Sequence, residues 1–562
     1  MTNLQIAELL RNIASSYQYK DENKYKFQII AYNRAADAVE HSTSELKDLW
    51  DDGKLDQVPS IGASIASHLD EIFRNGKSKH FEKIMSGIPE DAFKLMILPK
   101  VGVKTAIKMI DELPKSELKK KISEAEALSN KTKRHLLPYA ETIASEVTEW
   151  LKEGPDIIKV DSLGSLRRKV ATVGDIDIAV ASNNPSLVFE RFVNYPKIQK
   201  VIEKGEHTSS ILLPGNVQID LLVVNPESYG SALQHFTGSK HHNIALREYS
   251  LKKGLSMSEY GIKDLKNRKN IKLKTEEKLY DYLGLDYIEP ELREDTGEIE
   301  ASKEHTLPKL IELEDVKGDL QIHSDFDIET SHDLGVSTME DLVEKGRSKG
   351  YEYIAFTEHN PSRGKHNDNE IVEILKRKRE NIDQLNYSIS KSVNNRVIHV
   401  FNSLEIDIPT DGGLSIPEKG LELLDFALVS IHSSFDTNRD IMTKRILSAL
   451  SYPKVKIFAH PTARKINERE GIEIDWEEVF DFCLKNNKYL EINADPMRLD
   501  LPDNLIRDAV KIGVKLTFGT DTHEVTMMDN MKYGVYTARR GWATKKDIIN
   551  TMSLVDIKKI LT

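Results

Sequence analysis

Apolar residues recur with a helical period along the first 135 residues of the chain. Runs such as LQIAELLRNIA and FQIIAYNRAADAVE place apolar side chains three or four positions apart, and polar stretches separate these runs. Such a repeat keeps the apolar side chains on one face of a helix. The pattern therefore predicts a helical N-terminal region.

The period changes in the centre of the chain. Between residues 156 and 224 the runs IIKVDSL, DIDIAVAS, SSILLP and VQIDLLVV are short, β-rich and bounded by Gly, Pro or Asn, which is typical of strands. Residues 231–290 return to a helical pattern, and an acidic, Pro-containing stretch follows (EPELREDTGEIEASKEHTLPKL). We expect an α+β unit, then a mostly helical unit, then a linker.

From Gly318 onward, strand-like runs alternate with helical segments such as STMEDLVEKGRSKG. This succession predicts a parallel sheet or a β/α barrel. Most of the strand-like runs end in His, Asp or Glu, and active-site groups of β/α barrels gather at the C-terminal ends of strands. The runs are YIAFTEH, VIHVFNSLEIDI, FALVSIH, KIFAHP, YLEINA and KLTFGTDTH.

Composition and charge limit the classes of protein. The 562 residues suffice for several domains of roughly 100–200 residues each. The formal net charge of −11 means that a nucleic acid would have to be held by local basic surface, and residues 100–134 carry ten Lys/Arg against five Asp/Glu. Cys483 is the only cysteine, which excludes an intrachain disulfide and thiolate metal sites. No apolar run approaches the ~20 residues that span a bilayer, so we expect a cytoplasmic protein without membrane contact.

Two glycine hairpins repeat one pattern near the N-terminus. Residues 58–62 (VPSIG) and 98–102 (LPKVG) each precede a helical run. Backbone N–H groups at the start of the following helix can bind a phosphate without reading a base. A simple packing corner is the alternative, but two copies, the second in the basic region, favour DNA contact at Gly62, Gly102 and Lys104. Each hairpin resembles the helix-hairpin-helix element of DNA-binding proteins.

Three carboxylates form the sharpest signal. Asp175 and Asp177, in TVGDID, share a strand face because side chains at i and i+2 point the same way. Asp220, in VQIDLLVV, can join them from a neighbouring strand. Such a set binds two hard ions, Mg²⁺ or Mn²⁺, which can activate a hydroxyl and stabilise leaving pyrophosphate. The preceding turn GSLRR offers backbone and hydroxyl donors to phosphate, and Arg168 adds a charged contact. The alternative is a solvated strand end.

The GSLRR turn followed by GDID resembles the nucleotidyltransferase signature, and HFTGSK at residues 235–240 narrows the resemblance to the family X DNA polymerases, over residues 1 to about 295. The resemblance implies that Asp175, Asp177 and Asp220 are the catalytic metal ligands and that Arg247 touches the template. It implies nucleotide-binding positions at Gly164, Ser165, Arg168, Gly174, His235, Phe236, Gly238 and Asn243.

The chain departs from this family at two places. His235 stands where better-known members have a Tyr that faces the sugar, which puts discrimination against ribonucleotides in question. Ser64 and His68 occupy the positions of two lysines of the family's 5′-deoxyribose phosphate lyase. Because an imidazole cannot form the required imine, we expect the lyase to be absent or to use another group.

The strand ends of the C-terminal half carry a row of imidazoles and carboxylates. A lone His at a strand end is more often structural, but their joint occurrence suits a cluster of two or three ions of Mn²⁺, Zn²⁺ or Fe²⁺. The motifs DLQIHS, TEHNPS, LEID, SIHSS, AHPTAR and GTDTHE resemble, in order, those of the PHP (polymerase and histidinol phosphatase) phosphoesterases. The resemblance implies the ligands His323, His359, Glu405, His432, His460, Asp521 and His523. Gln321 replaces the leading His of the first motif, and Asp333 is the best substitute for its displaced Asp.

These patterns predict a multidomain architecture. It comprises a helical N-terminal domain with helix-hairpin-helix elements, an α+β nucleotidyltransferase palm, an α/β thumb and a distorted β/α barrel of the PHP type. The expected boundaries are 1–80 for the N-terminal DNA-binding domain, 81–140 for a fingers-like helical subdomain, 141–230 for the palm, 231–300 for the thumb, 301–316 for a linker and 317–562 for the PHP domain.

The expected function is filling of short gaps in base excision repair by a monomer that uses gapped or nicked DNA and dNTPs. The PHP half would hydrolyse phosphate esters at DNA 3′ ends as a 3′→5′ exonuclease, a 3′-phosphatase or an abasic-site endonuclease. Two alternatives stay open. One is a DNA-binding nuclease or phosphatase with a non-polymerising N-terminal half, and the other is a small-molecule phosphoesterase fused to a nucleotidyltransferase.

Overall fold

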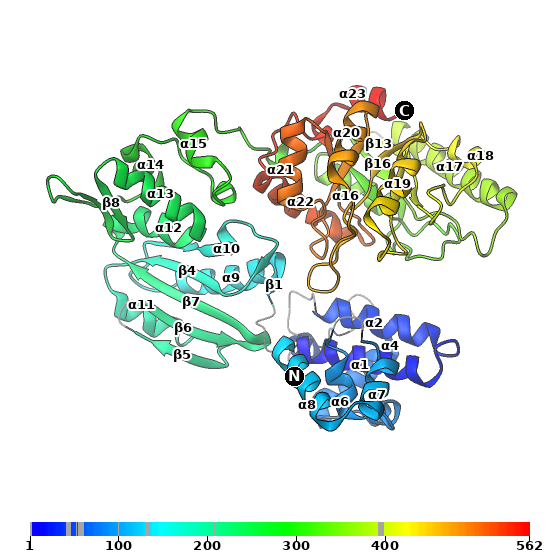
Figure 1. Cartoon of the computed structure of the whole chain (residues 1–562), viewed down its shortest axis with the longest axis horizontal. Coiled ribbons are helices and arrows are strands. Elements are labelled where there is room, and N and C mark those ends of the chain that lie inside the picture. The colour runs from blue at the N-terminus through cyan, green and yellow to red at the C-terminus, as the bar shows by residue number, and fades with distance from the viewer. Residues whose placement is uncertain are drawn as a thin grey trace.

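A computed structural model describes residues 3–40, 46–51, 53, 55, 61–98, 101–129, 134–205, 208–391 and 398–562. The N-terminal helices, the central α+β region and the C-terminal β/α region form separate bodies (Figure 1). The chain begins in the first body and ends in the third. The bodies correspond to stretches of the sequence in which the apolar residues recur with different periods.

The N-terminal region is helical, as the 3.6-residue period predicts. One apolar core includes Ile6, Leu10 and Leu69, and a second, smaller core includes Leu95 and Ala106. The helices are α1 (Asn3–Asp21), α2 (Lys26–Glu40), α3 (Leu46–Asp51), α4 (Ala63–Asn75), α5 (Lys79–Met85), α6 (Glu90–Leu95), α7 (Val103–Glu112) and α8 (Lys115–Ser129).

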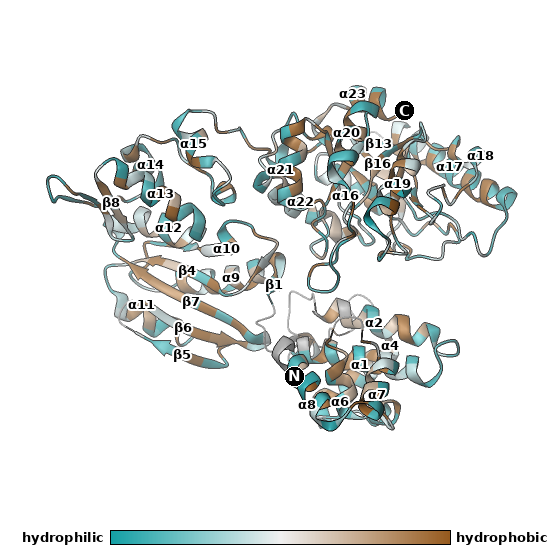
Figure 2. Ribbon diagram, in the orientation of Figure 1, coloured by the Kyte–Doolittle hydropathy of each residue, from teal (hydrophilic) through white to brown (hydrophobic). Residues whose placement is uncertain are grey.

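A mixed five-stranded sheet forms the central region, which we call the palm. Along its strand β7, Val217, Ile219 and Leu221 are buried while the residues between them are half-buried, which is the period of two expected of a strand. Apolar colouring follows β4, β6 and β7 in Figure 2. In spatial order the strands are β2 (Lys159–Ser162), β4 (Ile176–Ala181), β7 (Val217–Val224), β6 (Thr208–Leu213) and β5 (Lys200–Lys204), and a short pair, β1 (His135–Leu136) and β3 (Thr172–Val173), lies apart. Helices α9 (Leu137–Lys152) and α11 (Pro185–Phe192) supply much of the core beneath the buried face.

The segment after the palm, which we call the thumb, combines helices with a small antiparallel sheet. The helical expectation for residues 231–290 is wrong at residues 255–271, where three short strands lie in the order β10-β9-β8. These strands are too short for a period of two to stand out in the sequence. The elements are α12 (Tyr229–Thr237), α13 (Lys240–Lys252), β8 (Leu255–Ser258), β9 (Gly261–Asp264), β10 (Asn270–Ile271), α14 (Glu276–Leu283) and α15 (Glu298–Lys303).

Eight strands, all paired in parallel, frame the C-terminal region. They lie in two sheets, and an isolated parallel bridge joins the sheets at each side, His359 to Glu405 and Ile322 to Thr522. The strands therefore close into a ring. They are β11 (Gly318–Ile322), β12 (Tyr353–Phe356), β13 (His399–Asn402), β14 (Glu405–Asp407), β15 (Ala427–Ser430), β16 (Val455–Phe458), β17 (Tyr489–Asn493) and β18 (Leu516–Gly519).

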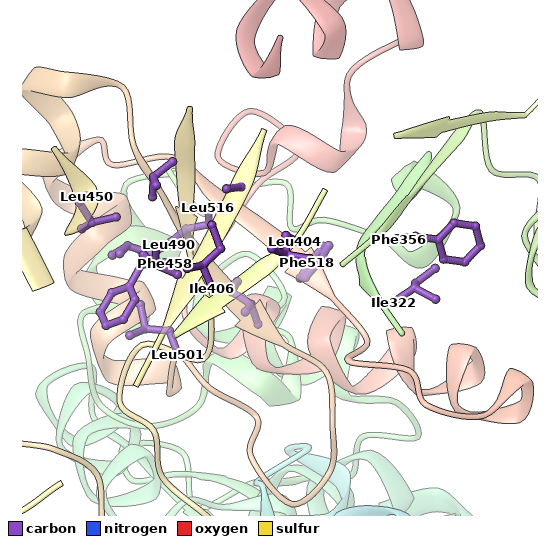
Figure 3. Close-up of a cluster of buried hydrophobic side chains, with 14 of the residues drawn as sticks. Ile322, Phe356, Leu404, Ile406, Leu450, Phe458, Leu490, Leu501, Leu516 and Phe518 are labelled. Atoms are coloured by element: carbon purple, nitrogen blue, oxygen red, sulfur yellow. The ribbon is translucent and has the colours of Figure 1, made fainter. Parts of the chain in front are cut away.

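Alternate residues of these strands belong to two different apolar clusters. Phe356, Ile406, Phe458 and Phe518, from four strands, are part of the larger cluster, which also takes in residues of the surrounding helices (Figure 3). Tyr353 lies in the other cluster, on the face of β12 opposite to Phe356. The helices of this region are α16 (Met339–Ser348), α17 (Asp368–Lys391), α18 (Glu418–Leu421), α19 (Arg439–Leu450), α20 (Trp476–Asn486), α21 (Asp503–Ile512), α22 (Met531–Arg540) and α23 (Leu554–Leu561).

Helix α22 joins the ring to the palm. Its Met531 and Val535 are buried in the core of the ring, whereas Tyr533 is buried in the core of the palm. The Tyr533 hydroxyl donates to Glu141 Oε2 of α9 at 3.2 Å, and Lys532 Nζ lies 3.0 Å from the same oxygen. The two halves therefore share buried side chains and a carboxylate. Among the described residues, no helix is both long and apolar enough to cross a membrane.

A buried ion pair fixes the thumb to the palm. Glu276, at the start of α14, accepts from Arg293 Nη1 at 2.6 Å and from Arg167 Nη1 at 3.0 Å. The Arg293 side chain is fully buried and that of Glu276 is 4% exposed. Burial disfavours the carboxylate, but the two guanidinium groups outweigh it and lower the pKa of Glu276 to about 2.

We expect Glu276→Gln to lower the free energy of unfolding at pH 7 by about 3 kcal/mol, because the substitution leaves two buried cations without their counter-charge. The folded-state pKa lies below the ordinary value of 4.5. The contribution is therefore complete above about pH 4.5 and is lost as the pH falls toward 2. Urea unfolding of both proteins at several pH values measures the difference. Glu277→Gln, an exposed neighbour on the same helix, is the control, and equal effects of the two substitutions would contradict the expectation.

Candidate active sites

The palm carboxylates come from two adjacent parallel strands. β4 and β7 pair so that Asp177 stands opposite Asp220. Asp175 lies two residues before Asp177, just before β4 begins, and its charge acts on Asp177. The structure thus brings the three predicted residues to one edge of the sheet. Their ligand atoms are not among the groups of described residues that lie within 4.8 Å of one another.

The electrostatics of this edge favour a cation. Burial, then the charges of Asp220 and Asp175, raises the pKa of Asp177 to about 7. Burial and Asp220 also raise the pKa of Asp175. Like charges repel and disfavour the ionised forms, and a bound divalent cation would reverse that effect. An all-oxygen set of this kind fits Mg²⁺ or Mn²⁺.

The predicted phosphate turn packs directly against these carboxylates. Gly164 begins the short helix α10 (Gly164–Arg167) at φ +58°, a conformation that favours glycine. A Cβ atom at this position would lie 2.5 Å from Asp177 Oδ2. Only glycine therefore fits between the turn and the carboxylate. Ser165 is half-buried in the same turn, and a Cβ on Gly174 would lie 3.2 Å from the Arg134 guanidinium.

The predicted nucleotide-binding residues of the thumb face this turn. Arg168 Nη1 donates to the carbonyl of Thr237 at 2.5 Å, and its Nε donates to Glu294 at 3.0 Å. A Cβ on Gly238 would lie 3.2 Å from Arg168 Nη1. Phe236 is 36% exposed, which leaves its ring open to a ligand.

His235 is linked to the next predicted residues along α13. Asn243 Nδ2 donates to the His235 carbonyl at 2.7 Å, and Arg247 Nη2 lies 3.1 Å from His235 Nδ1. The ring of His235 meets that of Phe236 edge to face, with centroids 4.7 Å apart. Arg168, His235, Asn243 and Arg247 thus form one connected surface at the junction of palm and thumb.

The two hairpin glycines occupy equivalent positions. Gly62 is the N-cap of α4 and Gly102 the N-cap of α7, both with extended backbone at negative φ. A Cβ on either would meet no atom of the described residues within 4 Å. Lys104 is exposed and lies 3.6 Å from Glu22. The turn residues 58–60, 99 and 100 lie outside the described residues.

Neither side chain at the two predicted lyase positions is an amine. Ser64 and His68 both lie on α4. The ring of His68 stacks on that of His80 with centroids 4.2 Å apart and an interplanar angle of 2°. His80 Nε2 in turn lies 2.9 Å from the Tyr17 hydroxyl. This aromatic cluster occupies the helix face where the lyase lysine is expected.

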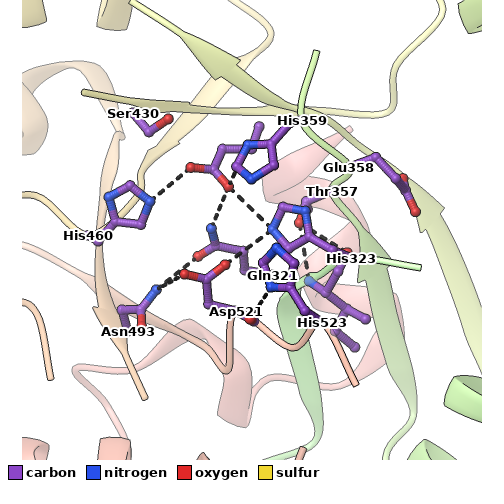
Figure 4. A network of polar contacts seen from close by, with 12 residues as sticks. Gln321, His323, Thr357, Glu358, His359, Ser430, His460, Asn493, Asp521 and His523 are labelled. Carbon is purple, nitrogen blue, oxygen red and sulfur yellow. Dashed lines mark hydrogen bonds and ion pairs between the residues drawn. The ribbon is translucent and has the colours of Figure 1, made fainter. Parts of the chain in front are cut away.

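The seven C-terminal ligands implied by the PHP motifs converge at one end of the ring, and Figure 4 labels His323, His359, His460, Asp521 and His523 among them. Glu405 lies at the centre: its Oε1 is 2.8 Å from His460 Nε2 and 3.2 Å from His432 Nε2. Its Oε2 is 3.3 Å from His323 Nε2 and 3.7 Å from His359 Nδ1. The residues are His323, His359, Glu405, His432, His460, Asp521 and His523.

Several imidazoles of this cluster are buried without a hydrogen-bond partner. Nδ1 of His323, Nδ1 of His359 and Nδ1 of His460 are in this state, whereas His323 Nε2 lies 3.2 Å from Asp521 Oδ1 and 3.3 Å from Glu405 Oε2. The ring centroid of His323 lies 4.6 Å from that of His359 and 4.3 Å from that of His523. Burial lowers the pKa values of His359 and His523, which keeps these rings neutral and able to bind a metal. The donor set therefore fits a cluster of transition-metal ions.

The structure adds His332 and Asp407 to the potential ligands of this region and does not group the predicted Asp333 with them. His332, Asp407 and His432 form a further group of potential ligands, with His332 Nε2 and His432 Nδ1 each 2.7 Å from Asp407. Asp333 lies outside these groups and pairs with Arg34, and its side chain is 61% exposed. The motifs SHD and LEID contain His332 and Asp407, but sequence alone could not show which neighbour faces inward. His366 lies beside Glu329 and outside these groups.

Gln321 supplies hydrogen bonds where its position suggests an imidazole. Its Nε2 donates to Glu405 Oε2 at 2.8 Å. Asn493 Nδ2 lies 3.2 Å from Asp521 Oδ2 and 3.2 Å from Glu491 Oε2. Two side-chain amides therefore donate to three carboxylates at the deep end of the cluster.

Comparison with known proteins identifies the family. A model of the helix-hairpin-helix domain matches residues 1–78, and a model of the DNA polymerase beta thumb matches residues 232–294. The chain is 33% identical over 588 residues to the "DNA polymerase/3′-5′ exonuclease PolX" of Bacillus subtilis (strain 168), covering 100% of this chain and 99% of the relative. This chain belongs to the family X DNA polymerases.

Other relatives of this family X polymerase match parts of it. It is 23% identical to DNA polymerase lambda of Rattus norvegicus over 52% of this chain and 56% of that protein. It is 26% identical to a probable phosphatase of Caldicellulosiruptor saccharolyticus over 33% of this chain and 74% of that protein. The relatives thus include one protein with a polymerase name, one with a phosphatase name and one whose name joins a polymerase to an exonuclease.

We expect Mn²⁺ to stabilise the chelator-treated protein, because the buried imidazoles gain ligand bonds only in the folded state. At a free concentration 100 times the Kd, binding contributes about 2.7 kcal/mol, or roughly a 5–10 °C rise in Tm. His460→Ala should reduce this rise, whereas His366→Ala should leave it intact. Differential scanning calorimetry with and without Mn²⁺ tests the expectation, which an unchanged Tm of the wild type would contradict.

Proposed function

We propose that this chain is a DNA-templated DNA polymerase that fills short gaps in base excision repair and also hydrolyses phosphate esters at DNA 3′ ends. The observation that carries the proposal is the full-length similarity to a relative named for both activities. It is supported by two separate candidate metal sites, one built from carboxylates and one from imidazoles and carboxylates. The substrates would be dNTPs and gapped or nicked DNA.

In the polymerase site, Asp175, Asp177 and Asp220 would hold two Mg²⁺ or Mn²⁺ ions. The ions supply activation of the primer hydroxyl and charge stabilisation of the leaving pyrophosphate. Gly164 keeps the turn close to Asp177 and exposes backbone N–H groups to phosphate. Ser165 and Arg168 add a hydroxyl and a guanidinium for the same oxygens, and together these donors would orient the triphosphate for in-line displacement.

The remaining proposed contacts surround this centre. His235, Phe236, Gly238 and Asn243 would line the sugar and base, Gly174 would lie beside the triphosphate, and Arg247 would touch the template. The hairpin positions Gly62, Gly102 and Lys104 would contact the DNA backbone on either side of a gap. No lyase step is part of this proposal, because neither Ser64 nor His68 can form the imine.

The C-terminal ring is proposed to be a distorted barrel of the PHP type. Its seven implied ligands, joined by His332 in place of Asp333, would hold two or three ions of Mn²⁺, Zn²⁺ or Fe²⁺. The ions supply a water-derived nucleophile and polarise the phosphate. The similarity to an exonuclease by name favours 3′→5′ exonuclease action. Phosphatase and abasic-site endonuclease action are further outcomes that a panel of 3′ ends would separate.

The domain assignment follows from this proposal. The matched models support a helix-hairpin-helix domain near residues 1–80 and a thumb near 231–300. The fingers-like subdomain at 81–140, the palm at 141–230, the linker at 301–316 and the PHP domain at 317–562 complete it. A monomer in the cytoplasm stays a prediction from the sequence.

The two activities should respond to separate substitutions on one substrate, a duplex with a one-nucleotide gap. Asp220→Ala should lower nucleotide incorporation by about three orders of magnitude, equivalent to about 4 kcal/mol of transition-state stabilisation, and leave 3′ resection unchanged. His460→Ala should do the reverse. Gel assays of extension and resection with Mg²⁺ and with Mn²⁺ measure both.

If the wild type extends the primer no better than Asp220→Ala, the polymerase assignment is wrong. Resection abolished by His460→Ala without any incorporation would then favour a nuclease with a non-polymerising N-terminal half. Failure to bind gapped DNA at low salt would instead favour a small-molecule phosphoesterase.

A further inference from the structure

Two adjacent arginines end helix α22 and reach different parts of the polymerase half. Arg539 Nε donates to Glu291 at 2.8 Å, and its Nη1 donates to Glu312 at 2.6 Å. Arg540 Nη1 donates instead to the backbone carbonyl of Arg168 at 2.8 Å. A residue of the C-terminal ring therefore holds the last residue of the phosphate turn in the palm.

Arg540 also shares a carboxylate with the Arg168 side chain. Glu294 Oε1 accepts from Arg540 Nη1 at 2.9 Å and from Arg168 Nε at 3.0 Å. On its other side, the Arg540 guanidinium lies 2.6 Å from Asp503, at the start of α21. The Arg540 side chain is 8% exposed, so these contacts are largely shielded from water and are stronger than surface pairs.

We propose that Arg540 is a positioning residue for the polymerase reaction, which rests on the proposed role of Arg168 as a triphosphate contact. To reach a triphosphate, Arg168 has to give up Glu294, and a carboxylate left without a partner at a half-buried site is costly. Arg540 remains on Glu294 and offsets that cost. Its bond to the Arg168 carbonyl meanwhile keeps the turn in place beneath the nucleotide.

The turn transmits this constraint to the catalytic carboxylates. Arg168 follows α10 directly, and its backbone N–H donates to the carbonyl of Gly164 at 3.2 Å. Gly164 itself has no room to move toward Asp177, since a Cβ would already clash there. The C-terminal half thus sets the affinity of the polymerase for its nucleotide through one side chain, without contacting the nucleotide.

Single-nucleotide gap filling at varied dNTP concentration tests the proposal. Arg540→Ala should raise the KM for dNTP by about 10-fold, the scale of one charged hydrogen bond, with a smaller change in kcat. Arg540→Lys keeps the charge but cannot bond the carbonyl and both carboxylates at once, and should give an intermediate KM. The matched control Arg539→Ala removes a neighbouring arginine of similar burial and should leave the KM near that of the wild type.

Adding Glu294→Gln to Arg540→Ala separates positioning from a general structural effect. The amide no longer holds Arg168 by charge, so the double variant should show a KM between those of Arg540→Ala and the wild type, since the bond to the Arg168 carbonyl is still missing. A merely structural role predicts no recovery. The proposal is wrong if the KM of Arg540→Ala equals that of the wild type, if Arg539→Ala raises it equally, or if the double variant shows no recovery.

Exonuclease activity and Tm of each variant show that the C-terminal half is folded. If Arg540→Ala does not fold, Arg540→Lys carries the same comparisons. A wild type without incorporation overturns the proposed function itself, whereas an active wild type with an insensitive Arg540→Ala overturns only the role of Arg540.

Discussion

The shared packing of helix α22 is the interaction on which the arrangement of the chain depends. The helix gives Met531 and Val535 to the core of the ring and Tyr533 to the core of the palm. Trp542, just beyond its end, is buried in the core of the thumb. One short segment near the C-terminus thus contributes side chains to three apolar cores. Burial of these side chains removes apolar surface from water in each core. The relative placement of the two candidate active sites follows from this packing.

The two candidate sites draw their potential ligands from the fold in different ways. In the palm, parallel pairing of β4 and β7 places two aspartates side by side and adds a third two residues earlier. Their mutual repulsion and burial make the empty set unfavourable, so a hard cation is the natural counter-charge. In the ring, six strands or strand ends supply the seven implied ligands, and one carboxylate, Glu405, interacts with four imidazoles. The mixture of imidazoles and carboxylates suits softer ions.

The sequence predicted both sites because each rests on short-range geometry. The i, i+2 spacing of Asp175 and Asp177 and the strand-end position of His460 are visible in a few letters. Residues that depend on distant segments were not predictable. The roles of Asp407 and His332 required knowing which side chains of neighbouring loops face inward, and Asp333 faces Arg34 of a remote helix instead. The thumb was expected to be α/β, but the position of its small sheet at residues 255–271 was not predicted, since short strands carry little periodic signal.

The shared cores also bear on how such a chain can vary over time. Leu499 and Tyr533, from the ring, belong to the palm core, and Asn467 donates from the ring to the backbone of Arg134. A fragment ending at the acidic linker would lose these side chains and expose apolar surface that the whole chain covers. In this chain the halves are therefore not independent, although DNA polymerase lambda and the probable phosphatase each match only part of it. A protein built like one half alone would need polar side chains at the positions that this chain buries between palm and ring.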